Sequence, residues 1–107
     1  MSWAIELLDS RVKAELDALP KDMRASFERI VRLIQTQGLE RVREPCVKHL
    51  EDALWELRLK GKDGIARAVY VTATGRRIVV LRVFTKRTQK TPRRELELAA
   101  RRAKEIS

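Results

Sequence analysis

Two glycine-containing turns divide the middle of the chain into three segments that predict neighbouring strands. Residues 54–59, 65–72 and 77–84 alternate apolar and polar side chains or run apolar, which is typical of β-strands. Gly61-Lys-Asp-Gly64 and Thr74-Gly75-Arg76 separate them, and both have the composition of hairpin turns. The sequence therefore predicts three antiparallel strands as the centre of the fold.

A strand and two helices are predicted before this sheet. Residues 3–8 have the pattern of a short strand, and Asp9 with Ser10 provides a helix start. Pro20 ends that first helix, because proline disrupts the hydrogen bonding of a helix interior. The second helix has one apolar stripe at helical spacing and Gly38 as its expected C-cap. The stripe consists of Met23, Phe27, Ile30, Val31 and Ile34.

A last helix is predicted after the sheet. Thr91 is its expected N-cap and Pro92 its first residue, since proline is tolerated in the first turn. Its expected buried stripe is Leu96, Ala100 and Ala103. The chain has 107 residues, which suits one domain over residues 1–107. We expect an α+β fold with an N-terminal strand, a helical hairpin, three antiparallel strands and a C-terminal helix.

Positive charge is concentrated in one segment. Residues 58–94 hold 12 of the 24 Lys and Arg residues but only one of the 15 acidic residues, so this segment carries +11 and the remainder −2. A surface this basic attracts polyanions, and nucleic acid is the first candidate partner. An ordinary solvated charged face is the alternative explanation.

Several classes of protein are excluded. The longest apolar stretches, such as residues 78–81, are four residues long, whereas a membrane-spanning helix needs about 20, so no membrane partner is expected. The first residues lack the pattern of a secretory signal, and we expect a cytoplasmic protein. Cys46 and His49 are single residues of their kinds, so we expect no internal disulfide, no zinc site and no cofactor.

Side-chain alternation along the strands sorts the basic residues by face. The faces expected to meet the helices carry Trp55, Leu57 and Leu59, then Ala66, Ala68 and Tyr70, then Val79, Leu81 and Val83. On the opposite face, four cations are expected to converge: Arg58, Arg67, Arg82 and Lys86. Like charges on adjacent strands repel one another, which favours an absent polyanion as their partner.

Two aromatic residues of the strands are candidates for stacking on nucleic acid bases. For both Tyr70 and Phe84, a place in the hydrophobic core is the favoured interpretation. Phe84 is the better stacking candidate, because alternation places it beside Arg82.

Three stretches carry a resemblance to a known family. They are Leu54-Trp-Glu-Leu-Arg58, Gly64-Ile-Ala-Arg67-Ala-Val-Tyr70 and Ile78-Val-Val-Leu-Arg-Val-Phe84-Thr-Lys86-Arg-Thr-Gln-Lys-Thr-Pro92. With the predicted order of elements, they resemble the phage-derived HigB-like toxins of the RelE/ParE superfamily. The resemblance implies a type II toxin that enters the ribosomal A site and cleaves the bound mRNA. It also implies a cognate antitoxin, commonly one with a helix-turn-helix domain.

The resemblance also implies roles for particular residues. Family members place basic residues around the scissile phosphate, and the matching positions here are Arg58, Arg67, Lys86 and, less closely, Lys90 and Tyr70. Arg87 and Phe84 are the other candidates for RNA contact. Close relatives often have His where this chain has Arg82, so a proton-transfer role of that His is absent or reassigned here.

Cleavage of RNA by its own 2′-hydroxyl needs a base, an acid and donors that stabilise charge on the phosphate. Arginine is suited to the last task, because its guanidinium binds phosphate oxygens in pairs. We assign Arg58 and Arg67 to phosphate charge and Arg82 to substrate positioning or charge stabilisation. Lys86 is the candidate for proton transfer, since an amine crowded by cations loses its proton more readily.

Two alternatives to a nuclease stay open. One is a ParE-like toxin that binds DNA gyrase, and the other is an RNA-binding module without enzymatic activity. His49 is favoured as a surface or edge residue over a catalytic one, and Cys46 as a small buried apolar residue. Two-metal chemistry on Glu51, Asp52 and Glu56 lacks a supporting ligand pattern.

Overall fold

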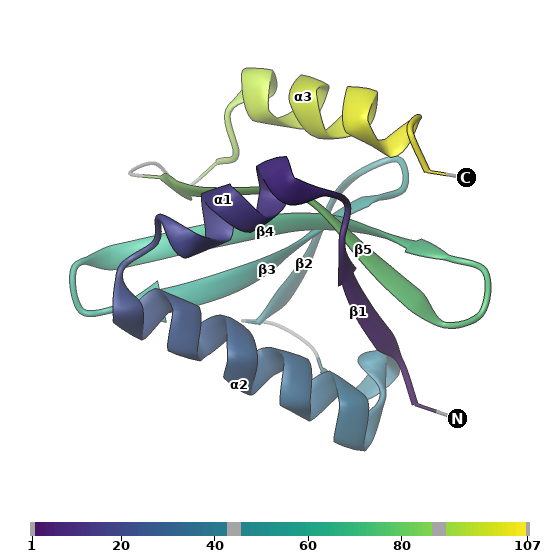
Figure 1. The fold of residues 1–107 in the computed structure, drawn as a ribbon, viewed down its shortest axis with the longest axis horizontal. Helices are drawn as coiled ribbons and strands as arrows, with labels where there is room; N and C mark the ends of the chain where they lie inside the picture. The colour runs from purple at the N-terminus through teal and green to yellow at the C-terminus, as the bar shows by residue number, and fades with distance from the viewer. Residues whose placement is uncertain (1, 43–45, 87–89, 107) are drawn as a thin grey trace.

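Five strands form a single sheet in the computed structural model, which describes residues 2–42, 46–86 and 90–106 (Figure 1). The strand order is β1-β5-β4-β3-β2. β1 is parallel to β5, and the other neighbours are antiparallel. The strands are β1 (Ala4–Leu7), β2 (Val47–Glu51), β3 (Leu54–Gly61), β4 (Gly64–Ala73) and β5 (Arg77–Lys86).

Helices cover both faces of the sheet. α1 (Ser10–Asp17) and α2 (Lys21–Gln37) precede a short 3-10 helix, η1 (Leu39–Arg41), and α3 (Arg93–Ala103) follows β5. α2 lies against one face, α3 lies on the other, and α1 runs beside the sheet between them (Figure 1). Within the described residues, no helix combines the length and apolar character needed to cross a bilayer.

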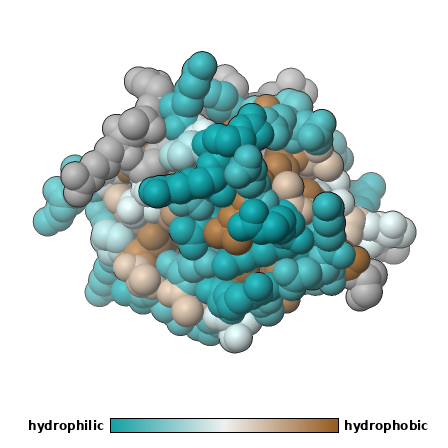
Figure 2. Space-filling view, turned by 90° about the horizontal axis from the view of Figure 1, so that it is seen from above, coloured by the Kyte–Doolittle hydropathy of each residue, from teal (hydrophilic) through white to brown (hydrophobic). Residues whose placement is uncertain are grey.

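Each face of the sheet has its own hydrophobic core. On the α2 face, the stripe of α2 packs on side chains of β3, β4 and β5, including Leu57, Tyr70 and Val80. On the α3 face, Leu96 and Ala99 of α3 pack on Val69, Leu81 and Phe84. Seen from the α3 side, the outer surface is mainly hydrophilic, with small separate hydrophobic areas (Figure 2). Charged helix faces therefore cover the apolar sheet.

The expected α+β fold is confirmed, with one strand added. The three central strands, the first strand and the helical hairpin lie where the sequence predicts them. Asp9 caps α1 by accepting from the amide of Arg11 at 3.0 Å, and Gly38 ends α2 with a φ of 89°. β2, which pairs with β3 at the sheet edge, was not predicted. Its five residues include three polar ones, Lys48, His49 and Glu51, so it has little apolar alternation.

Two predictions for the last helix are wrong. α3 begins at Arg93, and the Thr91 hydroxyl donates to Glu56 Oε1 at 2.8 Å instead of capping the helix. The buried side of α3 carries Leu96, Ala99 and Arg102, while Ala100 is exposed. Arg102 belongs on that side because its Nη1 donates to the Leu81 carbonyl at 2.8 Å.

The faces predicted for β5 are also corrected. Val69 is opposite Arg82 but Tyr70 is opposite Val80, so Leu81 is an extra residue, a β-bulge. The bulge reverses alternation within the strand. As a result, Ile78, Val80 and Val83 face α2, whereas Val79, Leu81 and Phe84 face α3.

A carboxylate of α1 joins three elements at the edge of the sheet. β1 pairs only with residues 77–80 of β5, so the following part of that edge has no neighbouring strand. There, Glu15 Oε1 accepts from the Val83 amide at 3.0 Å. Glu15 Oε2 also lies 2.9 Å from Nη1 of Arg82 and 2.9 Å from Nη1 of Arg102. One carboxylate thus links α1, β5 and α3.

We predict that Glu15→Ala lowers the free energy of unfolding by about 3–5 kcal/mol, because it removes a charged partner from two largely buried guanidinium groups and the acceptor of the Val83 amide. Urea unfolding would measure the change. Asp17→Ala is the matched control on the same helix: its exposed pair with Lys13 should contribute at most about 1 kcal/mol. Equal losses in the two variants would contradict the linking role of Glu15.

Candidate functional site

Two arginines lie directly opposite each other on the α3 face of the sheet. Arg58 of β3 pairs with Arg67 of β4, and Arg67 in turn pairs with Phe84 of β5. We call Arg58 and Arg67 the arginine pair. Like charges directly opposite on neighbouring strands destabilise a sheet, so this arrangement needs compensation from nearby groups.

The compensation comes from one buried carboxylate. Glu56 is 1% exposed and Arg67 is 2% exposed. Glu56 Oε2 lies 3.2 Å from Arg67 Nε, which makes an ion pair without hydrogen-bond geometry. Burial lowers the pKa of Arg67; the charge of Glu56 opposes this shift, and Arg58 adds to it. One carboxylate therefore faces two guanidinium groups.

Several donors of the arginine pair have no partner. The buried Nε of Arg58, and the buried Nε and Nη1 of Arg67, make no hydrogen bond in the described structure. Each buried donor that lacks an acceptor lowers the stability of the fold by about 1–3 kcal/mol. An anion with several oxygens, such as a phosphate, would satisfy these donors.

Glu56 also connects the arginine pair to the segment before α3. Its Oε1 accepts from the Thr91 hydroxyl at 2.8 Å. From the sequence, Glu56 is a candidate only as a metal ligand. Alternation along β3 places Glu56 on the same face as Arg58, which could have indicated that the two side chains are neighbours. The burial of this carboxylate beside two arginines depends on tertiary packing and could not be predicted.

Arg82 lies on the same face, but its guanidinium is already paired with two carboxylates. Its Nε donates to Glu95 Oε1 at 2.7 Å, and its Nη1 lies 2.9 Å from Glu15 Oε2. The hydrogen bond to Glu95 is the largest cause of its raised pKa, with Glu15 adding to it against burial. Its guanidinium also lies 5.8 Å from the centre of the Phe84 ring. The structure therefore places Arg82 in the contacts that hold α1 and α3.

Three of the four cations lie on one face of the sheet as expected, but that face was expected to be free of helices and α3 covers part of it. Arg58, Arg67 and Arg82 share the α3 face. The backbone of Lys86 pairs with Ile65 at the end of β5, while its side chain lies outside the described part of the structure. Arg87 lies outside the described residues, and Lys90 is exposed on the segment that leads to α3.

The two aromatic candidates are both core residues, as favoured by the sequence. Phe84 is 8% exposed and belongs to the core under α3. Tyr70 is 1% exposed and lies on the α2 face, away from the arginine pair. Neither ring is open to a base from the α3 side.

The other polar candidates lie on β2. His49 is exposed at the sheet edge, its Nε2 is 2.9 Å from the Asp52 carbonyl, and its ring centroid is 4.8 Å from that of Trp55. Glu51 is held by Arg93, with contacts of 2.8 and 2.9 Å. Among the described residues, no group of three or more His, Cys, Asp or Glu side chains is placed to hold a metal ion.

A family comparison identifies the chain. Residues 14–104 match the family described as phage derived protein Gp49-like. The chain belongs to this family. No curated protein matches this Gp49-like chain.

A solved structure shares the fold of the Gp49-like chain. It is the crystal structure of the archaeal RelE-RelB complex from Pyrococcus horikoshii OT3. The matched chain has a TM-score of 0.58 and 20% sequence identity, covering 79% of this chain and 96% of that one. The RelE-like fold predicted from the sequence is confirmed.

We predict that inorganic phosphate stabilises the protein through the arginine pair. At ten times its Kd, phosphate should raise the free energy of unfolding by about 1.4 kcal/mol, which corresponds to a Tm increase of roughly 6 °C. Thermal unfolding in phosphate and in chloride at equal ionic strength would measure the difference.

Two variants identify where the anion binds. Arg58→Gln should abolish the phosphate effect, whereas Arg101→Gln, which changes an exposed arginine of α3, should retain it. An equal effect in both variants would show general binding to a basic surface and not a site.

Proposed function

We propose that this Gp49-like protein is the toxin of a type II toxin–antitoxin system, a HigB-like endoribonuclease that cleaves mRNA in the ribosomal A site without a metal ion. The observation that carries the proposal is the arginine pair, whose buried donors lack partners and match the oxygens of a phosphate. Its place on a sheet of the RelE-like fold supports the same function.

The proposed chemistry is attack of an RNA 2′-hydroxyl on the adjacent phosphorus. The developing negative charge on the phosphate oxygens is stabilised by donors that are already in place. Arg67 is 2% exposed and is held by the sheet and by Glu56, so its guanidinium is fixed in place before RNA binds. Arg58 is half-buried and provides a second guanidinium from the next strand.

Other residues take supporting roles in this proposal. Glu56 positions Arg67, and Arg82 acts indirectly by holding α1 and α3. Lys86 stays the proposed proton-transfer group, and Arg87 and Lys90 are proposed RNA contacts. Since this is a weak set of acids and bases, we propose that the ribosome orients the message and that free RNA is a poor substrate.

A protein partner follows from the same proposal. The matched RelE chain was solved in complex with RelB. We propose that this chain likewise binds a cognate antitoxin, for which a helix-turn-helix protein is expected. A small helix-turn-helix gene beside this one would support the pairing.

We predict that Arg58→Ala and Arg67→Lys each reduce cleavage on translating ribosomes by about 100-fold or more, because each removes a transition-state contact. Toeprinting of ribosomes would measure the cut message. Arg101→Ala is the matched control and should leave cleavage unchanged. Unfolding of each variant in urea would separate loss of chemistry from loss of fold.

Each alternative has a distinct result. Persistent RNA binding with no cut message would indicate an RNA-binding module, and gyrase inhibition with intact message would indicate a ParE-like toxin. Cleavage within a few-fold of the original protein in both arginine variants would remove the arginine pair from the active site.

Binding to single-stranded RNA should depend strongly on salt. Contact with about five phosphates predicts a slope of about −3.5 in log K against log salt, or roughly a hundredfold loss of affinity between 50 and 200 mM. Fluorescence anisotropy with a labelled oligonucleotide would measure it. A flat salt response would argue against phosphate contact.

A further inference from the structure

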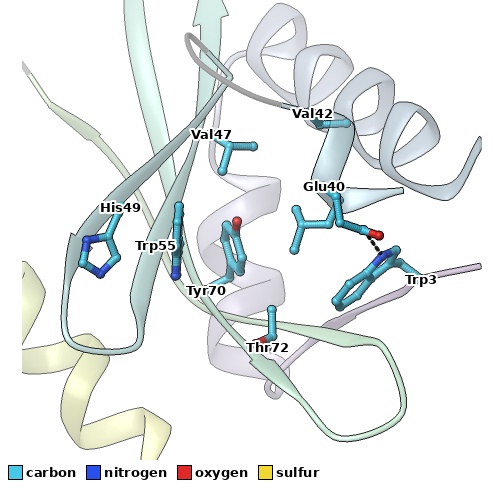
Figure 3. A pocket seen from close by; sticks show the side chains of 9 residues that line it. Trp3, Glu40, Val42, Val47, His49, Trp55, Tyr70 and Thr72 are labelled. Atoms are coloured by element: carbon cyan, nitrogen blue, oxygen red, sulfur yellow. Dashed lines mark hydrogen bonds between the residues drawn. The ribbon is translucent and has the colours of Figure 1, made fainter. Parts of the chain in front are cut away.

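An aromatic cavity opens on the α2 face, on the opposite side of the sheet from the arginine pair. Its volume is about 700 Å³, within the range of small-molecule sites. Trp55 and Tyr70 are cross-strand partners that form one wall, and Trp3 stands across from them (Figure 3). His49 lies beside Trp55 at the rim. Both tryptophans of the chain therefore line this one cavity.

Polar atoms are placed among these rings. Tyr70 is 1% exposed as a whole residue and lines the cavity, and burial raises the pKa of its hydroxyl. Glu40 of η1 accepts from Trp3 Nε1 at 3.1 Å, and Thr72 contributes a hydroxyl beside Tyr70 on β4. These groups offer hydrogen-bonding atoms beside the aromatic rings, which favours a ligand that is both flat and polar at its edge.

The charge around the cavity restricts what can bind. An aromatic cavity with a carboxylate would ordinarily attract a cation. Here, however, Arg76 and Arg41 lie near Glu40. The pKa of Glu40 is lowered mainly by hydrogen bonds from its own amide and from Trp3, and to a smaller extent by the charges of these two arginines. The two arginines offset the carboxylate, so a flat, neutral group is favoured over a cation.

The polar atoms also argue against an aliphatic side chain. An aliphatic group would fill the space but could form no hydrogen bond with the Tyr70 hydroxyl, the Thr72 hydroxyl or Glu40. A nitrogen heterocycle has both a flat face for the indoles and an edge with donors and acceptors.

We propose that this cavity binds a nucleobase, with the aromatic side chains contacting its ring and Tyr70, Thr72 and Glu40 bonding its edge. The base belongs either to a free nucleotide or to a single strand. The site is separate from the arginine pair, and its proposal does not depend on mRNA cleavage.

Tryptophan fluorescence provides a direct test, because both tryptophans report on this cavity. We expect saturable quenching by nucleoside monophosphates in the millimolar range, excited where the nucleotides do not absorb. Ribose 5-phosphate should not quench. A trinucleotide that binds more tightly than a mononucleotide would assign the base to a strand, and equal affinities would assign it to a free nucleotide.

Variants locate the effect. Trp55→Ala should weaken binding at least about 10-fold by loss of stacking, and Tyr70→Phe should weaken it about 5-fold by loss of one hydrogen bond. Thr72→Val should weaken binding, whereas Thr74→Val, which changes an exposed threonine in the next turn, should not. Tyr70→Phe keeps the ring, so it tests the hydroxyl with little change in packing.

Three results would overturn the proposal. They are no saturable quenching, equal quenching by ribose 5-phosphate, and tighter binding of N-acetyl-leucine amide, which would indicate a protein side chain as the occupant. Arg58→Gln should leave quenching unchanged, although we expect it to reduce cleavage strongly. The nucleobase site and the proposed nuclease can therefore fail independently.

Discussion

The contacts of Glu15 at the sheet edge hold the layers of this protein together. β1 ends early, and the amide of Val83 would have no acceptor without this carboxylate. Once Glu15 is placed there, Arg82 and Arg102 gather around it, and α3 is fixed over its face of the sheet. Arg82, one of the basic residues on that face, is therefore held in ion pairs that stabilise the fold. The arginine pair, by contrast, keeps buried donors that form no hydrogen bond in the described structure.

The two faces of the sheet have different chemistry because different helices cover them. Beside the arginine pair on the α3 face, the buried carboxylate of Glu56 is paired with Arg67 while Arg58 adds a second positive charge, so the local balance there is positive and suits an anion. On the α2 face, the helix leaves an aromatic cavity beside η1 with little net charge. A sheet of five strands thus separates a charged site from an aromatic one.

Much of the fold could be predicted from the sequence because its signals are local. The turns around Gly61 and Gly75 fix the hairpins, and the stripe of α2 gives its buried face. The site was predicted in part: alternation correctly placed Arg58 and Arg67 together, since no bulge interrupts β3 or β4 between them. The ion pairs of Arg82 could not be predicted, because its partners lie on α1 and α3 and their positions around β5 depend on tertiary packing.

The bulge at Leu81 has a consequence for comparing relatives. It shifts the alternation of side chains along β5 by one residue. Residues before and after the bulge that lie on the same face of the sheet are therefore separated by an odd number of positions. In a homologue without the additional residue, the side chains at the end of this strand would lie on the opposite faces of the sheet, unless the preceding turn changed length by one residue. Alignments across this strand should therefore follow the three-dimensional register, and gaps placed by sequence similarity alone would assign Phe84 to the wrong side.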